Sequence, residues 1–171
     1  VALAKDNPEP EAKATALIAK AEIIFCLDFS NLSRINSLGD KIRNATATKV
    51  LIDHHLEPER FAMYEQWDPA SASTAGLIFE LIEALGEKDK LDATIATCLY
   101  AGLMTDTGSF KHNNTRHREF QIASELVRCG ANPHTIAQQI YDTNSLERLR
   151  LTGFVLSKKL VVLPEYHTAY M

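Results

Sequence analysis

The sequence predicts an α/β fold in which a mostly parallel sheet has flanking helices. The main observation is a pair of short apolar runs, residues 22–28 (EIIFCLD) and 49–53 (KVLID), on either side of a helical segment. Unbroken apolar runs of this length are typical of strands covered on both faces, and the order strand, helix, strand indicates a βαβ unit. We therefore expect two parallel, neighbouring strands joined by a right-handed crossover.

Helical spacing predicts the elements around these strands. Residues 9–21 are rich in Ala, Lys and Glu and place apolar residues three and four positions apart, which predicts a helix. Residues 31–45 predict a loop followed by the crossover helix. Residues 56–70 contain two prolines and one tryptophan and predict a loop.

Helices dominate the following part of the chain. Residues 74–85 follow a serine that can cap a helix and precede Gly86, which can end one. Residues 91–104 are apolar nearly all round and predict a buried helix that runs into a polar turn at 105–110. Three further helices and a closing hairpin are predicted at residues 116–129, 133–141, 145–157 and, for the hairpin, 160–163 with 167–171.

Length and composition are those of an ordinary globular domain. The chain has 171 residues, 46% hydrophobic and 23% charged, and can bury a sizeable core. Its formal net charge of −4 argues against binding long double-stranded nucleic acid by charge alone. Three cysteines, odd in number and far apart, predict reduced thiols and a cytoplasmic setting. No apolar run reaches membrane-spanning length, so we expect no membrane partner.

Polar residues follow both predicted strands. Asp28 ends the first, and Asp53, His54 and His55 end the second. The carboxyl ends of parallel neighbours lie at one edge of a sheet, where open α/β sheets bind their ligands. Asp106, in the stretch GLMTDTGSF, follows the predicted buried helix and adds a carboxylate. Carboxylates and imidazoles suit divalent ions such as Mn²⁺, Mg²⁺, Co²⁺ or Zn²⁺, so these residues are candidate metal ligands.

Each candidate also has a plainer interpretation. The run from Asp53 to His55 can be a solvated loop, Asp28 can cap the next element, and Asp106 can be a turn residue. Three other features are equally open. The helix start at Ser73 and Thr74 can be a cap or a phosphate site, Trp67 and Tyr64 can stack on a base or cover the core, and a basic cluster can contact phosphate or lie in solvent. That cluster comprises Lys111, His112, Arg116, His117 and Arg118.

Four stretches, in order, resemble the DHH phosphoesterase superfamily, which is named for its Asp-His-His motif. CLDFSNLSRI is similar to motif II, LIDHH to motif III, ASASTAGLIFELI to the helix that follows, and GLMTDTGSF to motif IV. The closer likeness is to the branch with a DHH-associated C-terminal domain, which includes RecJ-like exonucleases and bifunctional nano-RNA exonuclease and pAp phosphatases. The resemblance covers most of the chain.

The resemblance implies a role for each candidate residue. Asp28 would bridge two divalent metal ions, and His54 would bind the second ion with Asp106 beside it. His55 would lie near the substrate phosphate, and Asp53 would hold a histidine or nearby backbone in place. The expected ion is Mn²⁺, with Mg²⁺ or Co²⁺ as alternatives.

The resemblance also implies how the chain is divided. Residues 1–143 would be a partial DHH catalytic domain, 144–159 a connecting helix, and 160–171 the start of a DHH-associated substrate domain. Motif I, a His and two Asp on the first strand, is absent and is expected upstream of Val1; the glycine-rich substrate motif is expected beyond Met171. We therefore expect the sheet to lack its first strand or strands, and this chain by itself to be nearly inactive.

The function implied is metal-dependent hydrolysis of phosphate esters of nucleotides or short oligonucleotides by a two-metal mechanism. Three alternatives stay within the same core: a cyclic-dinucleotide phosphodiesterase, a pyrophosphatase or an exopolyphosphatase. A fourth is a non-catalytic regulatory module that binds nucleotides. The expected partner is a nucleotide or short oligonucleotide, and a homodimer is left open.

Overall fold

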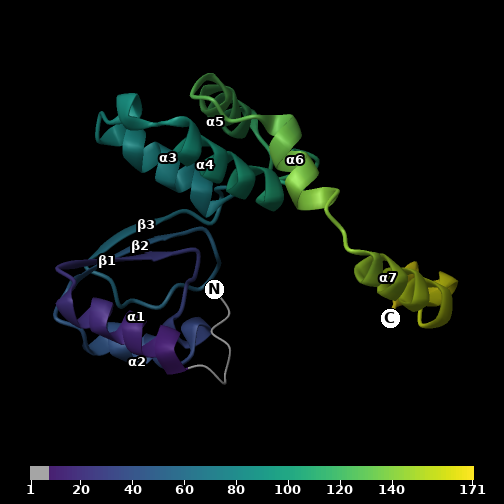
Figure 1. Ribbon diagram of the computed structural model, residues 1–171, viewed down its shortest axis with the longest axis horizontal. Helices are drawn as coiled ribbons and strands as arrows, with labels where there is room; N and C mark the ends of the chain where they lie inside the picture. The colour runs from purple at the N-terminus through teal and green to yellow at the C-terminus, as the bar shows by residue number, and fades with distance from the viewer. Residues whose placement is uncertain (1–7) are drawn as a thin grey trace. The chain divides into compact units, whose positions relative to one another are not determined.

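The computed structural model describes residues 8–171, which fall into two compact units divided after Ala131 (Figure 1). The first unit contains a sheet and five α-helices among its described residues, and the second contains two α-helices and a hairpin. No helix within residues 8–171 is long and apolar enough to cross a membrane.

The sheet of the first unit has three parallel strands in the order β1-β2-β3. They are β1 (Ile23–Leu27), β2 (Thr48–Asp53) and β3 (Tyr64–Trp67). In the register, Leu27 pairs with Ile52, and Asp53 pairs with Trp67. The predicted parallel βαβ unit is confirmed. The prediction that residues 56–70 form only a loop was wrong, because β3 adds to the sheet beside β2.

Helices α1 (Pro8–Lys20) and α2 (Ser37–Asn44) lie along one face of the sheet (Figure 1). A core of buried side chains joins them to the strands, with a 3₁₀ helix, Leu32–Ile35, between. Packing there is close: a Cβ on Gly39 of α2 would lie 2.3 Å from the carbonyl oxygen of Leu32. The buried members of this core are Cys26, Leu32, Ile42 and Leu51.

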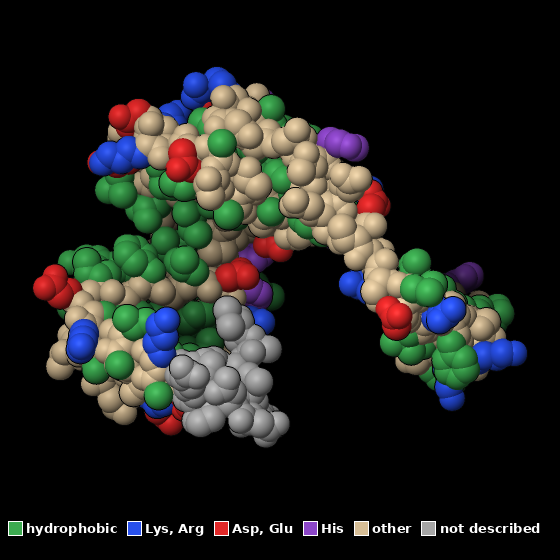
Figure 2. All heavy atoms as spheres, in the orientation of Figure 1, with side chains coloured by type: hydrophobic (Ala, Val, Ile, Leu, Met, Phe, Trp, Pro, Cys, Tyr) green, Lys and Arg blue, Asp and Glu red, His purple; other side chains and the backbone are tan. Residues whose placement is uncertain are grey.

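Within the part of the chain that the structure describes, strand β1 is covered on one face only. Cys26 is fully buried against the α1–α2 layer, whereas Ile23 and Phe25 on the alternate face are each 55% exposed. Side chains alternate across a strand, so this is one apolar face left open, and hydrophobic side chains gather along the sheet in Figure 2. The expectation that both faces of β1 are buried was therefore wrong among the described residues; α3 packs on β2 instead.

Three helices form the rest of the first unit: α3 (Thr74–Ala84), α4 (Ala93–Asp106) and α5 (His117–Arg128). Their shared core is built from buried side chains that include Leu77, Phe79, Leu103, Ile122 and Leu126. The prediction of α4 needs two corrections. The helix exposes Cys98, so it is not buried all round, and Asp106 is its last residue and not part of a following turn.

The second unit contains α6 (Pro133–Tyr141) and α7 (Leu146–Lys158). An antiparallel hairpin follows, with β4 (Val161–Leu163) and β5 (Thr168–Tyr170) on either side of a 3₁₀ helix, Pro164–Tyr166. The predicted helices and hairpin of this segment are confirmed. Every residue of α7 is at least partly exposed.

The buried thiol of Cys26 gives a test of this core. Burial raises the pKa of Cys26 from 9.0 to about 11, so the thiol should stay protonated and resist alkylation. Native-state iodoacetamide labelling, read by mass spectrometry, is expected to modify the exposed Cys98 and to modify Cys26 only after unfolding. Because the unfolded chain loses this proton at lower pH, the free energy of unfolding should fall between pH 9 and about pH 11.

Cys98→Ser is the matched control for this labelling, because it removes the exposed thiol and leaves the core intact. Equal labelling rates for Cys26 and Cys98 in the native protein would contradict the packing described for β1.

Candidate metal centre

The candidate residues meet at the carboxyl edge of the sheet. Asp28 directly follows β1, and His54 and His55 directly follow β2. The Asp28 backbone N–H donates to the Ile52 carbonyl oxygen at 3.2 Å, which continues the strand ladder by one residue. There Asp28 has a φ of 66°, a left-handed conformation that aspartate tolerates better than most residues. Strand pairing therefore holds Asp28 beside the histidines.

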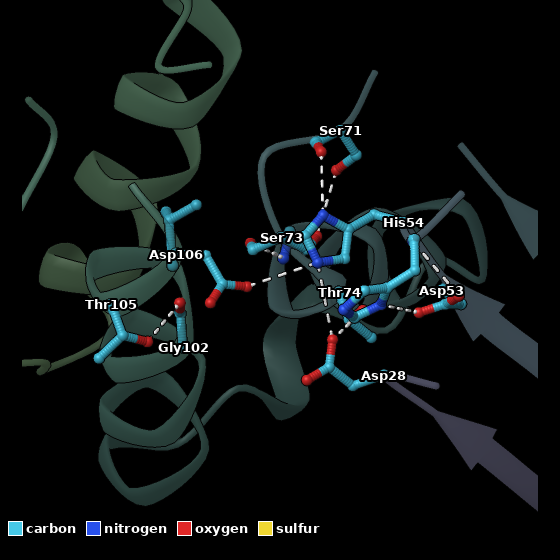
Figure 3. A network of polar contacts seen from close by, with 12 residues as sticks. Asp28, Asp53, His54, Ser71, Ser73, Thr74, Gly102, Thr105 and Asp106 are labelled. Carbon is cyan, nitrogen blue, oxygen red and sulfur yellow. Dashed lines mark hydrogen bonds and ion pairs between the residues drawn. The ribbon is translucent and has the colours of Figure 1, made fainter. Parts of the chain in front are cut away.

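His54 lies between two carboxylates. Its Nε2 atom is 3.7 Å from Oδ1 of Asp28 and 3.7 Å from Oδ2 of Asp106, the last residue of α4 (Figure 3). Ligand bonds of about 2.1 Å let one ion reach two atoms up to about 4.2 Å apart. The donor atoms are therefore close enough to share a divalent cation, and their chemistry fits Mn²⁺, Mg²⁺ or Co²⁺.

A hydrogen bond at Nδ1 of His54 determines which of the two ring nitrogens is available to a metal. Nδ1 lies 3.2 Å from the carbonyl oxygen of Ser71. A carbonyl can only accept, so Nδ1 carries a proton, and Nε2 is the nitrogen that offers a lone pair on the side of the two carboxylates when the ring is neutral. Histidines that bind metals commonly have this arrangement, in which a backbone carbonyl sets the tautomer.

The charges around His54 favour a cation. Burial, and then the nearby Asp28 carboxylate, raise the pKa of Asp106, while His54 and His55 partly oppose the rise. Two carboxylates that approach one imidazole repel each other unless positive charge is added. A divalent ion between them would remove that repulsion.

His55 belongs to the same group and is hydrogen-bonded to Asp53. The Asp53 carboxylate is fully buried, and its Oδ1 is 2.7 Å from Nδ1 of His55. Its other oxygen accepts the His55 backbone N–H at 3.3 Å, and Trp67 donates from Nε1 to the His55 carbonyl at 2.7 Å. Three contacts thus hold one histidine.

The structure brings together most of the residues that the sequence singled out. Asp28, His54 and His55 each offer a ligand atom, all within 4.8 Å of one another, and Asp106 approaches His54 from α4. Asp53 does not face this group but lies behind His55. Side chains from three separate elements thus point to one place, which favours metal binding over a solvated loop or a turn.

Several contributors were missed or left open by the sequence. Ser73 is the N-cap of α3, accepting from Gly76, which confirms the plainer of its two interpretations. The neighbouring Thr74 hydroxyl donates to Oδ1 of Asp28 at 2.8 Å, a contact that no sequence pattern indicated. Trp67 supports His55 through its indole N–H. These contacts depend on tertiary packing, so motif spacing could not have revealed them.

The basic cluster favours its plainer interpretation. Arg118 donates to Glu80 at 2.9 Å and to Glu83 at 2.6 Å, both on α3, so its guanidinium is occupied by carboxylates. The remaining members of the cluster are exposed around the start of α5. A solvated helix start with one ion-pair network describes them.

Fold and site together define an α/β domain that gathers carboxylates and imidazoles at the carboxyl edge of a parallel sheet. Residues 2–103 match the model of the DHH family, N-terminal domain, and the chain belongs to this family. The resemblance drawn from the four sequence motifs is thereby confirmed.

Relatives and solved structures agree with this assignment. The crystal structure of an exopolyphosphatase-related protein from Bacteroides fragilis aligns with a TM-score of 0.90 and 38% identity, over 94% of this chain and 47% of that one. The bifunctional oligoribonuclease and PAP phosphatase NrnA of Bacillus subtilis is 31% identical over 79% of this chain and 42% of its own length. The cyclic-di-AMP phosphodiesterase GdpP of the same organism is 30% identical over 77% of this chain and 21% of its length. The chain spans less than half the length of these relatives.

Asp53→Asn tests the contact with His55. The backbone N–H of His55 can only donate, so the asparagine oxygen should accept it and the amide NH₂ should face the ring. His55 should then move its proton from Nδ1 to Nε2. Long-range ¹H–¹⁵N NMR spectra at alkaline pH report the tautomer of each ring.

His54 is the internal control for this experiment, because its Nδ1 faces Ser71 and should keep its proton in the variant. An unchanged His55 pattern in Asp53→Asn would show that the carboxylate does not set this tautomer.

Proposed function

We propose that this chain is the core of a metal-dependent phosphoesterase that hydrolyses phosphate esters of nucleotides or short oligonucleotides. The observation that carries the proposal is the convergence of Asp28, His54 and Asp106, with His54 Nε2 3.7 Å from each carboxylate. Membership of the DHH family and the printed activities of NrnA and GdpP support phosphate esters as the substrate class.

In this proposal Asp28, His54 and Asp106 hold the metal. Asp28 would supply carboxylate oxygens to a pair of divalent ions, and His54 and Asp106 would hold one of the pair; Mn²⁺ is the proposed ion. When bound, such a pair neutralises phosphate charge and makes hydroxide available at neutral pH. The raised pKa of Asp106 supports the placement of positive charge here.

In this proposal His55 lies beside the substrate phosphate. Its ring is held at Nδ1 by the buried Asp53, so Nε2 is the nitrogen that can meet a substrate or pass a proton. Trp67 holds the His55 backbone from the other side. Asp53 acts through His55 and has no proposed contact with substrate.

A wider proposal concerns the whole protein. We propose that residues 1–143 are part of a catalytic domain, 144–159 a connecting helix and 160–171 the start of a substrate domain, although the compact units divide earlier, after Ala131. The chain spans 42% of the length of NrnA, so the remaining ligands and the substrate-selecting groups are proposed to belong to the longer protein. We further propose a cytoplasmic setting, which the free thiols of Cys26, Cys98 and Cys129 support.

Metal binding by the 171-residue chain is the first test. Asp28→Asn and His54→Ala should each weaken Mn²⁺ binding by at least about tenfold in isothermal titration calorimetry, because each removes a proposed ligand. Asp89→Asn changes an exposed carboxylate on the 3₁₀ helix Lys88–Lys90 of the first unit, outside the group of proposed ligands, and is the matched control. Equal Mn²⁺ affinity in the unchanged chain and in Asp28→Asn would contradict the metal centre.

Hydrolysis by the longer protein is the second test. It should cleave pApA or pAp in a Mn²⁺-dependent reaction, and Asp28→Asn should abolish turnover, while the 171-residue chain should be nearly inactive. Polyphosphate and cyclic di-AMP are the comparison substrates, because an exopolyphosphatase-related protein and a cyclic-di-AMP phosphodiesterase are similar to this chain. Preference for either would reassign the substrate; Mn²⁺ and nucleotide binding without turnover would favour a regulatory module.

A further inference from the structure

We propose that the turn from Ser71 to Thr74 positions the ligands of the metal centre, and that the side chain of Thr74 orients Asp28. This inference rests on the proposed function, since it concerns how the proposed ligands are held. The turn contacts two of them at once: the Ser71 carbonyl meets Nδ1 of His54 at 3.2 Å, and the Thr74 hydroxyl donates to Oδ1 of Asp28 at 2.8 Å.

The turn is built to be rigid. Its residues Ala72, Ser73 and Thr74 are 1%, 0% and 5% exposed. Ser73 caps α3 by accepting from Gly76 at 3.0 Å, and the Ser71 hydroxyl donates to the Ser73 carbonyl at 3.1 Å. A buried turn held from within and anchored on a helix cannot shift without disturbing the start of α3. It therefore provides a fixed reference for flexible side chains.

Asp28 needs such a reference. Its side chain is 59% exposed, and among residues 8–171 the only hydrogen bond that reaches its carboxylate comes from Thr74. An exposed carboxylate without a partner samples several rotamers, and ordering it costs free energy when a ligand binds. The Thr74 hydroxyl holds Oδ1 on the side of His54, whose Nε2 lies 3.7 Å from the same oxygen.

The same turn sets both ligands because of where it lies in the chain. Asp28 follows β1 and His54 follows β2. Strand pairing places the backbone of these two residues but does not by itself determine their side-chain rotamers. The turn ends on the first residue of α3, and α3 is tied to the sheet by Gln66 of β3, which donates to the Leu77 carbonyl at 3.0 Å. One element docked on the sheet thus orients the side chains that end two strands (Figure 3).

Thr74→Ser and Thr74→Ala differ by one hydroxyl group and give the sharpest test. Thr74→Ser should bind Mn²⁺ nearly as tightly as the unchanged chain, whereas Thr74→Ala should bind about tenfold to hundredfold more weakly, the usual effect of losing a partner that orients a ligand. Isothermal titration calorimetry measures the affinities. Thr15→Ser and Thr15→Ala on α1 repeat the same pair away from the site and should bind Mn²⁺ alike.

The outcomes separate this inference from the function on which it rests. Equal Mn²⁺ affinities of Thr74→Ser and Thr74→Ala, with Asp28→Asn weakened, would overturn the role of Thr74 alone. Loss of the folded circular dichroism spectrum in Thr74→Ala would also overturn it, by assigning the hydroxyl to folding. Failure of the unchanged chain to bind Mn²⁺, or equal binding by Asp28→Asn, would overturn the metal centre and this inference together.

Discussion

The parallel pairing of β1 with β2 is the constraint on which the site depends. The register that pairs Leu27 with Ile52 places Asp28 and His54 side by side, one and two residues beyond the pair. A slip of one residue would turn every side chain of a strand to the opposite face and would move Cys26 or Leu51 out of the core. Because such a slip would expose apolar side chains to water, burial of the core also fixes the positions of Asp28 and His54.

The helix layer supplies what the strands cannot. Asp106 comes from the last turn of α4, and the Ser71–Thr74 turn comes from the start of α3, so the site exists only when these helices are docked on the sheet. Helix α3 packs on β2, and α3 packs on α4 in turn. The same buried apolar contacts that stabilise the first unit thus set the distances between the charged groups.

The sequence predicted the parallel strands, most of the helices and the side chains that gather at the sheet edge. It could do so because period and strand order act locally, and because parallel strands end at one edge. It failed where burial and pairing depend on tertiary structure. Phe25 is exposed although its strand is wholly apolar. Residues 64–67 pair with β2 as β3 although prolines flank them. The contact of Thr74 with Asp28 joins residues 46 positions apart, beyond the reach of any local pattern.

Three aspartates meet near two histidines, and their different surroundings argue for different tasks. Asp53 is fully buried and has both oxygens hydrogen-bonded to His55, so its charge is stabilised within the protein. Asp28 follows β1 and Asp106 ends α4, and each carboxylate lies 3.7 Å from His54 Nε2. Burial, and then repulsion by the Asp28 carboxylate, raise the pKa of Asp106.

The other two carboxylates are held less fully. Among residues 8–171 the Asp28 carboxylate accepts a hydrogen bond from Thr74 alone, and both Asp28 and Asp106 face the His54 ring, an arrangement that a bound cation relieves. Since a ligand that binds only the folded state stabilises that state, the cation would stabilise the junction of β1, β2 and α4 as well as provide the chemistry. The geometry proposed to bind the metal would then also be the geometry that the metal helps to hold.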